Sequence, residues 1–410
     1  MKKKKVTRVS KLLRGRCVQL TPLKIRNQSG LHDARVDAAG LGISVGDVVE
    51  FKNGKVTRLT PNLKGTSKWV DHVLDPRRLK GLKARQQVES GIREFFGKKH
   101  GFLEVRTPLL VPSPGMEPHI RPYTAGPLAQ GQNAYLPTSP EFAMKRLLSG
   151  GLEKIFQMSP CFRSEPLSRT HHPEFLMLEW YRAYAGYEEI MRDTEELICF
   201  LAKKLYGKPV IPHQGRKIRV KTPWPRLAIR DLFEEMTGVD LVKSASRDAL
   251  AEECRRLGIQ VGTKESWDDL YFKIWLDLIE PKLPVDQAVL VYGYPPSQAA
   301  LSVLTQDQDG NSWAKRFEVY AGGYELGNAF EELTDAREQR RRFESEMAIR
   351  ARTYGDAFPP NPVDEGFLGA LEEGMPPSGG IAVGVDRLIM LLADEPDIEY
   401  TIWLPSEHTD

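Results

Sequence analysis

The segment that most constrains the fold is FRSEPLSRTHHPEFLMLEWYR, at residues 162–182. If its second half forms a strand, successive side chains point to opposite faces of a sheet. Glu179 then shares one face with Phe175, Met177 and Tyr181. A carboxylate in so apolar a strand is costly to bury unless it meets a cation. The pattern therefore indicates either an internal pair between Glu179 and an arginine or a pocket floor that receives an ammonium group.

A second segment, FEVYAGGYELGNAFEELTDAREQ at residues 317–339, repeats this mixture of acidic and apolar residues. Its AGG run at 321–323 predicts a hairpin turn, which places Glu318 and Glu325 on neighbouring strands. Two carboxylates brought together in this way suit Mg²⁺, whose other ligands are usually waters and substrate phosphates. A surface position would explain any one of these acids, but it explains poorly a whole set among Tyr, Leu, Phe and Gly. One strand face further along carries Asn328, Phe330 and Glu332.

The segment GGIAVGVDRLIMLL, at residues 379–392, predicts a strand that turns into an apolar helix. Gly384 permits close approach of another backbone, and Asp386 is placed to cap the helix. Arg387 then lies in the first helical turn. A glycine-rich turn of this kind is a weak signal by itself, because many such turns are only structural.

We expect a basic, β-rich module over residues 1–75, similar to a reduced OB-like barrel. The first 80 residues hold 19 lysines and arginines against 6 acidic residues. That charge suits either a solvated tail or a surface for a polyanion or an acidic protein. An Asn-Gly dipeptide at 53–54 predicts a hairpin. The β-prone runs around it cover residues 17–20, 34–36, 48–51 and 56–59.

Residues 80–410 have the pattern of a larger domain. Val88, Ile92, Phe95 and Phe96 recur at a helical period. Beyond them, strand-like and helical runs alternate without a regular βαβ rhythm, which predicts an α+β fold with a largely antiparallel sheet. Within this domain we expect a helical insertion at about 244–282, strands over 288–292 and 316–330, and a charged helix over 335–352.

The composition excludes several classes of protein. With 410 residues, 41% of them hydrophobic, the chain can bury a sizeable core. No apolar run approaches the ~20 residues of a membrane span, and the lysines at residues 2–5 are not followed by the apolar stretch of a signal peptide. The four cysteines have neither metal-binding spacing nor disulfide density. These features are typical of a cytoplasmic protein.

Taken together, the segments at 162–182, 317–339 and 379–392 resemble motifs 2 and 3 of the class II aminoacyl-tRNA synthetases. GFLEVRTPLLVPSPGMEPHI, at residues 101–120, resembles motif 1, with Pro108 at the position of the dimer-interface proline. The resemblance is specific because three motifs occur in order. It implies an antiparallel sheet flanked by helices, a homodimer, and ATP-dependent adenylation of a carboxylate.

The resemblance also implies how ATP is bound. Adenylation builds negative charge on the phosphates, so cations must stabilise the transition state. Arg163 would hold the α-phosphate and the substrate carboxylate with its planar fork, and Arg387 would cover the adenine; these two are the expected catalytic residues. Glu318 and Glu325 would hold Mg²⁺. The expected ATP-binding set is Arg163, Ser164, Glu165, Arg169, His171, His172, Phe175, Glu325, Leu326, Gly384 and Arg387.

Individual roles within this set follow from the same resemblance. Glu165 would contact adenine, and Phe175 would stack beneath the base. Arg169 and His171 would reach the outer phosphates. His172 stands where the family usually has asparagine, although its imidazole can still donate a hydrogen bond to a phosphate or ribose.

The resemblance extends to the amino-acid pocket. TSPEFAMKRLL, at residues 138–148, is similar to the loop that receives the substrate amino group. Several carboxylates around one cavity suit lysine or (R)-β-lysine, which have two ammonium groups, and disfavour aspartate. An aspartate or asparagine enzyme would be expected to have a cation in place of Glu332. The expected substrate set is Ser139, Pro140, Glu141, Glu179, Tyr181, Asn328, Glu332 and Ala382.

Two members of the wider family fit these residues. One is a lysyl-tRNA synthetase with a reduced anticodon-binding domain, and the other is the elongation factor P–(R)-β-lysine ligase, which modifies a lysine side chain of a protein. Ala382 stands where the synthetases usually have glycine, and its methyl would reshape the pocket around the substrate amino group. Together with the WYR run at 180–182, SQA at 297–299 and LTDAREQ at 333–339, it favours the protein ligase, with tRNA as the alternative acceptor. The ligase is typically little more than a catalytic domain, and a full synthetase has a longer anticodon-binding domain. The length of the basic N-terminal module therefore matches neither of them.

A catalytically silent paralogue that only binds a regulator or nucleic acid is a third interpretation. It is disfavoured because Arg163, Glu165, Glu318, Glu325 and Arg387 are all present.

Overall fold

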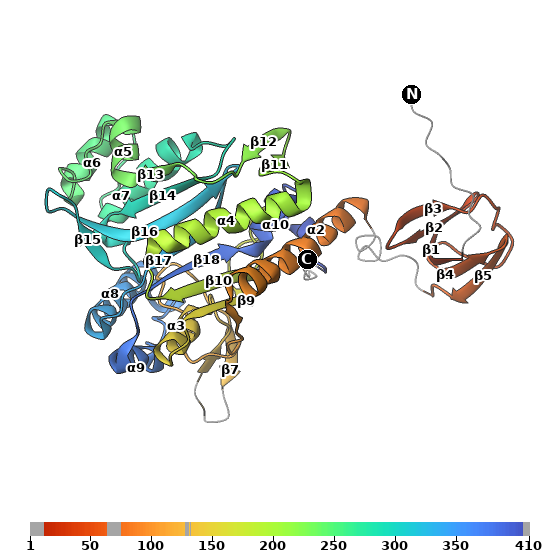
Figure 1. Ribbon diagram of the computed structural model, residues 1–410, viewed down its shortest axis with the longest axis horizontal. Coiled ribbons are helices and arrows are strands. Elements are labelled where there is room, and N and C mark those ends of the chain that lie inside the picture. The colour runs from red at the N-terminus through yellow and green to blue at the C-terminus, as the bar shows by residue number, and fades with distance from the viewer. Residues whose placement is uncertain (1–11, 64–74, 128–130, 132, 405–410) are drawn as a thin grey trace. The chain divides into compact units, whose positions relative to one another are not determined.

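The computed structural model describes residues 12–63, 75–127, 131 and 133–404. The chain divides into two units, Met1–Ala84 with Glu399–Asp410, and Arg85–Ile398. The first contains a small β-sheet, and the second a large sheet with helices packed on it (Figure 1). The lysine run at residues 2–5 and most of the linker after residue 63 lie outside the described residues.

The first unit carries a five-stranded antiparallel sheet in the order β3-β2-β1-β4-β5. The expected Asn-Gly hairpin joins its last two strands. Lys52 pairs with Lys55, and both Asn53 and Gly54 have positive φ, 51° and 80°. This turn geometry matches the twist of the strands that it connects. The strands are β1 Leu13–Leu20, β2 Leu23–Asn27, β3 Gly30–Asp33, β4 Val48–Lys52 and β5 Lys55–Thr60.

The prediction of a β-strand over residues 34–36 is wrong, because the backbone turns there. Arg35 has a left-handed φ of 53°, and its N–H donates to the Asp33 carboxylate at 2.8 Å. This local bond favours a turn over continuation of β3. The strands that the sequence analysis missed are β2 and β3. In β2 the fully buried Leu23 and Ile25 alternate with basic residues, so its apolar content is low even though its period is that of a strand.

The second unit is built on a nine-stranded sheet in the order β13-β14-β16-β17-β18-β10-β9-β6, with β15 paired to β16. Neighbouring strands are antiparallel except β13 with β14 and β6 with β9. This confirms the expected α+β fold with a largely antiparallel sheet. The strands are β6 Leu103–Glu104, β9 Lys154–Phe162, β10 Glu174–Ala183, β13 Arg226–Ala228, β14 Val289–Tyr294, β15 Leu304–Gln306, β16 Ser312–Ala321, β17 Tyr324–Glu331 and β18 Ser378–Gly384.

Helices cover one face of this sheet. In Figure 1, α4 runs across the sheet, and both α4 and α10 contact β17 and β18. Two small hairpins, β7 Thr124–Pro127 with β8 Asn133–Tyr135 and β11 Val210–His213 with β12 Arg216–Arg219, lie outside the main sheet. The helices are α2 Pro76–Arg93, α3 Glu141–Ser149, α4 Tyr187–Tyr206, α5 Ile229–Thr237, α6 Arg247–Arg256, α7 Trp267–Ile274, α8 Ala336–Tyr354, α9 Glu365–Gly374 and α10 Val385–Ala393.

Strand β10 divides its side chains between two faces, as its sequence predicts. Trp180 is fully buried, with its ring 4.9 Å from that of Phe96. Arg182, on the same face, pairs with Asp193 of α4 at 2.6 Å. This face of β10 is therefore covered, and the opposite face is left to form a site. The side chains there include Phe175, Met177 and Glu179, which line a cavity.

The prediction that Asp386 caps the last helix is wrong. α10 follows Gly384, and no side chain in the described part of the chain caps its first turn. The Asp386 carboxylate instead accepts the backbone N–H of Leu176 at 2.6 Å and pairs with Arg85. Both partners are distant in sequence, so no local pattern could reveal them. Asp386 ties α10 to β10 and to α2.

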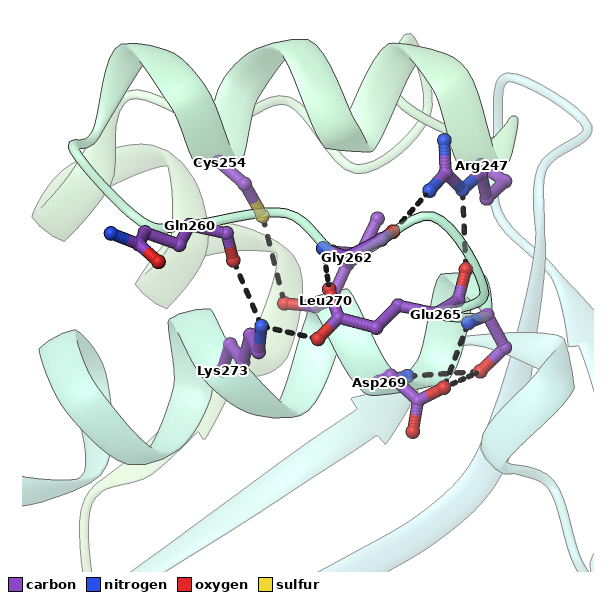
Figure 2. A network of polar contacts seen from close by, with 9 residues as sticks. Arg247, Cys254, Gln260, Gly262, Glu265, Asp269, Leu270 and Lys273 are labelled. Carbon is purple, nitrogen blue, oxygen red and sulfur yellow. Dashed lines mark hydrogen bonds and ion pairs between the residues drawn. The ribbon is translucent and has the colours of Figure 1, made fainter. Parts of the chain in front are cut away.

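The helical pair α6 and α7 lies within the stretch expected as an insertion, and polar contacts hold the loop between the two helices (Figure 2). The Glu265 carboxylate accepts the Gly262 N–H at 2.7 Å and pairs with Lys273 at 2.5 Å. Arg247 donates to the backbone carbonyl oxygens of Gly262 and Glu265, at 2.8 and 3.2 Å. Because Ser266 of this region lines the cavity, these contacts stabilise one of its walls.

No helix in the described ranges has both the length and the apolar character that crossing a membrane requires. All four cysteines are buried free thiols.

Candidate active site

A cavity of about 1560 Å³ opens on the uncovered face of the large sheet. Its walls come from β10, β17 and β18, from the start of α3, and from α7 and α8. The volume exceeds the range of roughly 300–1,000 Å³ of a typical small-molecule site. The cavity therefore has room for two substrates beside each other.

Two of the arginines that line this cavity, Arg163 and Arg387, belong to the expected ATP-binding set. Arg163 follows β9, and its guanidinium lies 5.3 Å from the centroid of the Phe175 ring. Its Nε is buried and has no hydrogen-bond partner among the described residues. Arg387, in the first turn of α10, donates to the Glu325 carbonyl at 3.1 Å and lies 2.7 Å from His171 Nε2. A guanidinium that lines a cavity is suited to bind an anion there.

His171 orients one of these arginines. Burial and the neighbouring Arg387 lower the pKa of His171, so its imidazole is neutral at neutral pH and Nε2 can accept from the guanidinium. Its Nδ1 lies 2.8 Å from the Ser168 hydroxyl. The expected partner in phosphate binding, Arg169, has an exposed side chain outside the cavity lining. The structure thus places His171, and not Arg169, at the cavity.

Glu318 and Glu325 lie on β16 and β17, which the expected glycine turn joins. Burial and the Glu318 carboxylate raise the pKa of Glu325 to about 7. Glu318 is held by Arg316 at 2.6 Å and by the Tyr320 hydroxyl at 2.7 Å. The described residues contain no cluster of three or more His, Cys, Asp or Glu suited to a metal, but Mg²⁺ commonly takes only one or two carboxylates beside phosphates. Two buried acids that repel each other fit such a cation.

A second group of acids includes Glu179, whose side chain is 1% exposed. Its Oε2 accepts the Tyr181 hydroxyl at 3.0 Å, whereas Oε1 has no hydrogen-bond partner within the described ranges. Burial and the nearby Glu141 raise the pKa of Glu179. The observed partner is a tyrosine, so the internal pair with an arginine is not found. Glu179 instead forms an acidic part of the cavity wall.

Glu141 and Glu332 have an internal cation that the sequence analysis missed. Lys145 of α3 is fully buried, with Nζ 2.6 Å from Glu141 and 2.5 Å from Glu332. Glu332 is 2% exposed and lies outside the cavity lining. Lys145 lies four residues after Glu141 on the same helix, and this spacing is the signal that could have identified it.

Ala382, on β18, lines the cavity. It pairs in register with Glu179 on β10 and with Asn328 on β17. Directly paired residues of antiparallel strands point to the same face, so all three side chains face the cavity. The Asn328 carbonyl oxygen accepts from Arg316 Nε at 3.0 Å. Arg316 also lines the cavity, and its position two residues before Glu318 on one strand could have revealed it.

The structure brings most of the expected residues to one cavity. Those that line it are Arg163, His171, His172, Phe175, Glu325, Leu326, Gly384 and Arg387 of the ATP-binding set, and Ser139, Pro140, Glu141, Glu179, Asn328 and Ala382 of the substrate set. The expected residues outside the lining are Ser164, Glu165, Arg169, Tyr181, Glu318 and Glu332.

The chain matches the model of one protein family, tRNA synthetases class II (D, K and N), over residues 61–408. The chain belongs to this family. The large sheet and its cavity are therefore a class II catalytic domain, and the β-rich module precedes it.

Within this family, the chain is similar to several lysine–tRNA ligases. The lysine–tRNA ligase of Chloroflexus aurantiacus is 35% identical over 338 residues, which cover 82% of this chain and 67% of the relative. The enzyme of the same name from Carboxydothermus hydrogenoformans is 36% identical over 343 residues, covering 84% and 68%. That from Moorella thermoacetica is 36% identical over 346 residues, covering 84% and 69%.

These comparisons support a class II ligase similar to lysine–tRNA ligases. The names of these relatives agree better with the alternative acceptor, tRNA, than with the protein acceptor that the sequence analysis favoured.

Proposed function

We propose that this chain activates lysine or (R)-β-lysine with ATP as an aminoacyl-adenylate and passes the aminoacyl group to an acceptor. The observation that carries the proposal is the Glu179 carboxylate, which is buried beside Glu141 and has one unpaired oxygen. A substrate ammonium group supplies the cation that this acid lacks. The same cavity holds Arg163 and Arg387, which suit the phosphates of ATP.

The side chains divide the work of adenylation. The substrate carboxylate attacks the α-phosphorus of ATP, and pyrophosphate leaves. Arg163 neutralises charge on both reacting groups, and Glu141 and Glu179 hold the ammonium end so that the carboxylate is correctly placed. Arg387, oriented by His171, binds the nucleotide. Mg²⁺, held by Glu318 and Glu325, would neutralise phosphate charge when it is bound.

Pyrophosphate exchange tests the activation step. Lysine or (R)-β-lysine should support exchange of labelled pyrophosphate into ATP, because both have two ammonium groups. Aspartate and asparagine should not, since a second carboxylate or an amide cannot neutralise the buried acids. Exchange driven by aspartate would contradict the proposed pocket, and its absence with every amino acid would favour the silent paralogue.

The relatives' names make tRNA the first candidate acceptor. A lysine side chain of elongation factor P is the second, and Ala382 is the observation that favours it. Its methyl group faces the cavity between Asn328 and Glu179. Extra volume at this point disfavours an amino group on the α-carbon and suits one displaced to the β-carbon.

One competition experiment separates the two acceptors. The protein is given ATP, labelled lysine or (R)-β-lysine, tRNA and unmodified elongation factor P together. Label in tRNA supports the lysine–tRNA ligase, and label in elongation factor P supports the protein ligase. The variant Ala382→Gly should shift the preference from (R)-β-lysine toward lysine. An unchanged preference would remove the support that Ala382 gives to the second acceptor.

A further inference from the structure

Lys145 is a buried cation beside the acids of the amino-acid pocket. It lies on α3, four residues after Glu141, with a fully buried side chain that is outside the cavity lining. Lysine is almost never buried so completely unless it is paired. Its partners are two acids of the substrate set, with Nζ 2.6 Å from Glu141 Oε1 and 2.5 Å from Glu332 Oε2. The ammonium group therefore stands behind the wall that faces the substrate.

The surroundings of Lys145 are acidic or apolar on each element that packs against it. From α9, the Phe367 ring lies with its centroid 5.8 Å from Nζ. The titratable groups that face Lys145 or its acids are Glu117 before β7, Glu141 on α3, Glu179 and Tyr181 on β10, and Glu332 after β17. Lys145 is thus the cation that acts on both Glu179 and Glu332.

The charges of this group depend on one another. Burial alone would lower the pKa of Lys145, but the carboxylates of Glu141 and Glu332 outweigh it and raise that pKa, so the amine is protonated. Burial raises the pKa of Glu332, and the Lys145 ammonium opposes this effect. Removing the cation would make Glu332 bind a proton more readily.

The number of charges also matches the proposed substrate. When Glu141, Glu179 and Glu332 are all ionised, their three negative charges stand against the single ammonium of Lys145, which leaves two to be balanced. A diamino acid brings two ammonium groups to the same place. Without Lys145, three neighbouring carboxylates would repel one another, and protons would compete with the substrate for them.

We propose that Lys145 is a positioning residue, which holds the Glu141 and Glu332 carboxylates in place so that the pocket selects a substrate with two ammonium groups. The inference rests on the proposed activation of lysine and deepens it, because it assigns the charge balance of the pocket to a residue that the substrate does not touch. A lysine with a merely structural role would stabilise the core without changing how lysine binding depends on pH.

The variant Lys145→Met tests this in the full chain, since methionine keeps the unbranched apolar stem and removes the charge. At neutral pH the KM for lysine should rise about tenfold, with the KM for ATP within about twofold, because Glu332 binds a proton more readily and Glu141 loses the cation that holds it in place. The acid limb of kcat/KM for lysine should move to higher pH by about one unit. Toward alkaline pH Glu332 ionises again, so the KM for lysine should move back toward the wild-type value.

Lys154→Met is the matched control, because Lys154 is an exposed lysine on β9. It should leave both KM values and the pH profile unchanged. Calorimetry of lysine binding in two buffers of different ionisation enthalpy adds a readout that needs no turnover. Lysine binding at neutral pH should release more protons from Lys145→Met than from the wild type, because protonated acids must ionise to pair with the substrate.

A second variant covers the case in which Lys145→Met does not fold. The double variant Lys145→Met with Glu332→Gln removes both charges of the Lys145–Glu332 contact, and such neutral replacements are commonly tolerated. It should fold and raise the KM for lysine more than that for ATP, because Glu141 loses the cation that holds it in place. Unfolding of both variants would assign Lys145 to the fold and overturn the inference.

The inference and the proposed function fail in different ways. A wild-type protein that exchanges no pyrophosphate with lysine or (R)-β-lysine contradicts the proposed function. The inference is wrong if the wild type is active and the variant keeps the same pH profile, with equal changes in the KM values for lysine and ATP.

Discussion

Glu179 shows how a ligand site lowers the stability of the fold that carries it. Its carboxylate is buried with one unpaired oxygen, and its pKa is raised by burial and by Glu141. The folded chain therefore binds this proton more tightly than the unfolded chain. The free energy of unfolding must fall as the pH rises from the unfolded to the folded pKa of Glu179.

We therefore predict that Glu179→Gln stabilises the substrate-free protein at alkaline pH. The gain should be about 1–3 kcal/mol near pH 8, the usual cost of a buried unpaired polar group, and should nearly vanish near pH 5, where both side chains are neutral. Urea denaturation of wild type and variant at the two pH values measures the difference. The same variant should raise the KM for lysine far more than that for ATP. Equal stability at both pH values would show that Glu179 is already paired.

His172 permits a test at the position where the resemblance leads us to expect asparagine. Its Nδ1 lies 2.6 Å from the Glu174 carbonyl oxygen and 3.2 Å from the Glu174 N–H. Asparagine has a polar atom at the same distance from its backbone and commonly forms such local turns. His172→Asn should therefore change the KM for ATP in pyrophosphate exchange by less than about threefold. A larger loss would mean that the imidazole itself contacts ATP.

At the scale of elements, the glycines of β18 determine how closely the pocket acids approach the sheet. A Cβ added at Gly380 would lie 2.3 Å from the Tyr181 ring and 2.6 Å from Glu332 Oε1. At Gly384 the nearest atoms, all of Arg387, are 3.9 Å or more away. The two glycines belong to one strand, but only Gly380 lacks the space for a Cβ atom.

Gly380→Ala should displace Tyr181 and Glu332, with a loss of about 1–3 kcal/mol of stability typical of overpacking. The KM for lysine should rise more than that for ATP, because the displaced groups belong to the amino-acid pocket. Gly384→Ala is the matched control for stability and should cost less than about 1 kcal/mol. Thermal denaturation and exchange kinetics check both; similar stability of the two variants would contradict the close packing at Gly380.

At the scale of the whole molecule, every residue that lines the cavity lies between residues 108 and 398. We therefore predict that a chain of residues 76–410 folds and keeps pyrophosphate exchange with lysine. Circular dichroism and exchange kinetics measure this, and loss of exchange by a folded truncated chain would contradict the proposed division into 1–75 and 80–410. If transfer to tRNA is lost while exchange is kept, the basic module helps to bind the acceptor.

The homodimer stays a prediction, which sedimentation of the full chain checks.

Several features of the fold and the site could be predicted because they depend on local patterns. The alternation along β10 placed Glu179 and Met177 on the cavity side and Trp180 on the covered side. The glycine turn after β16 brought Glu318 and Glu325 to neighbouring strands. A period of two or a tight turn is visible in a few consecutive residues.

The sequence by itself determined the α+β class and the family, and most of the site residues that it predicted line the cavity. Tertiary structure alone decided that Asp386 pairs with Arg85 instead of capping its helix, and that Lys145 meets Glu332 behind the pocket. These partners lie on elements far apart in the chain. The pairing of a buried charge depends on which elements the fold packs against it, because the low dielectric of the interior makes the nearest opposite charge dominate.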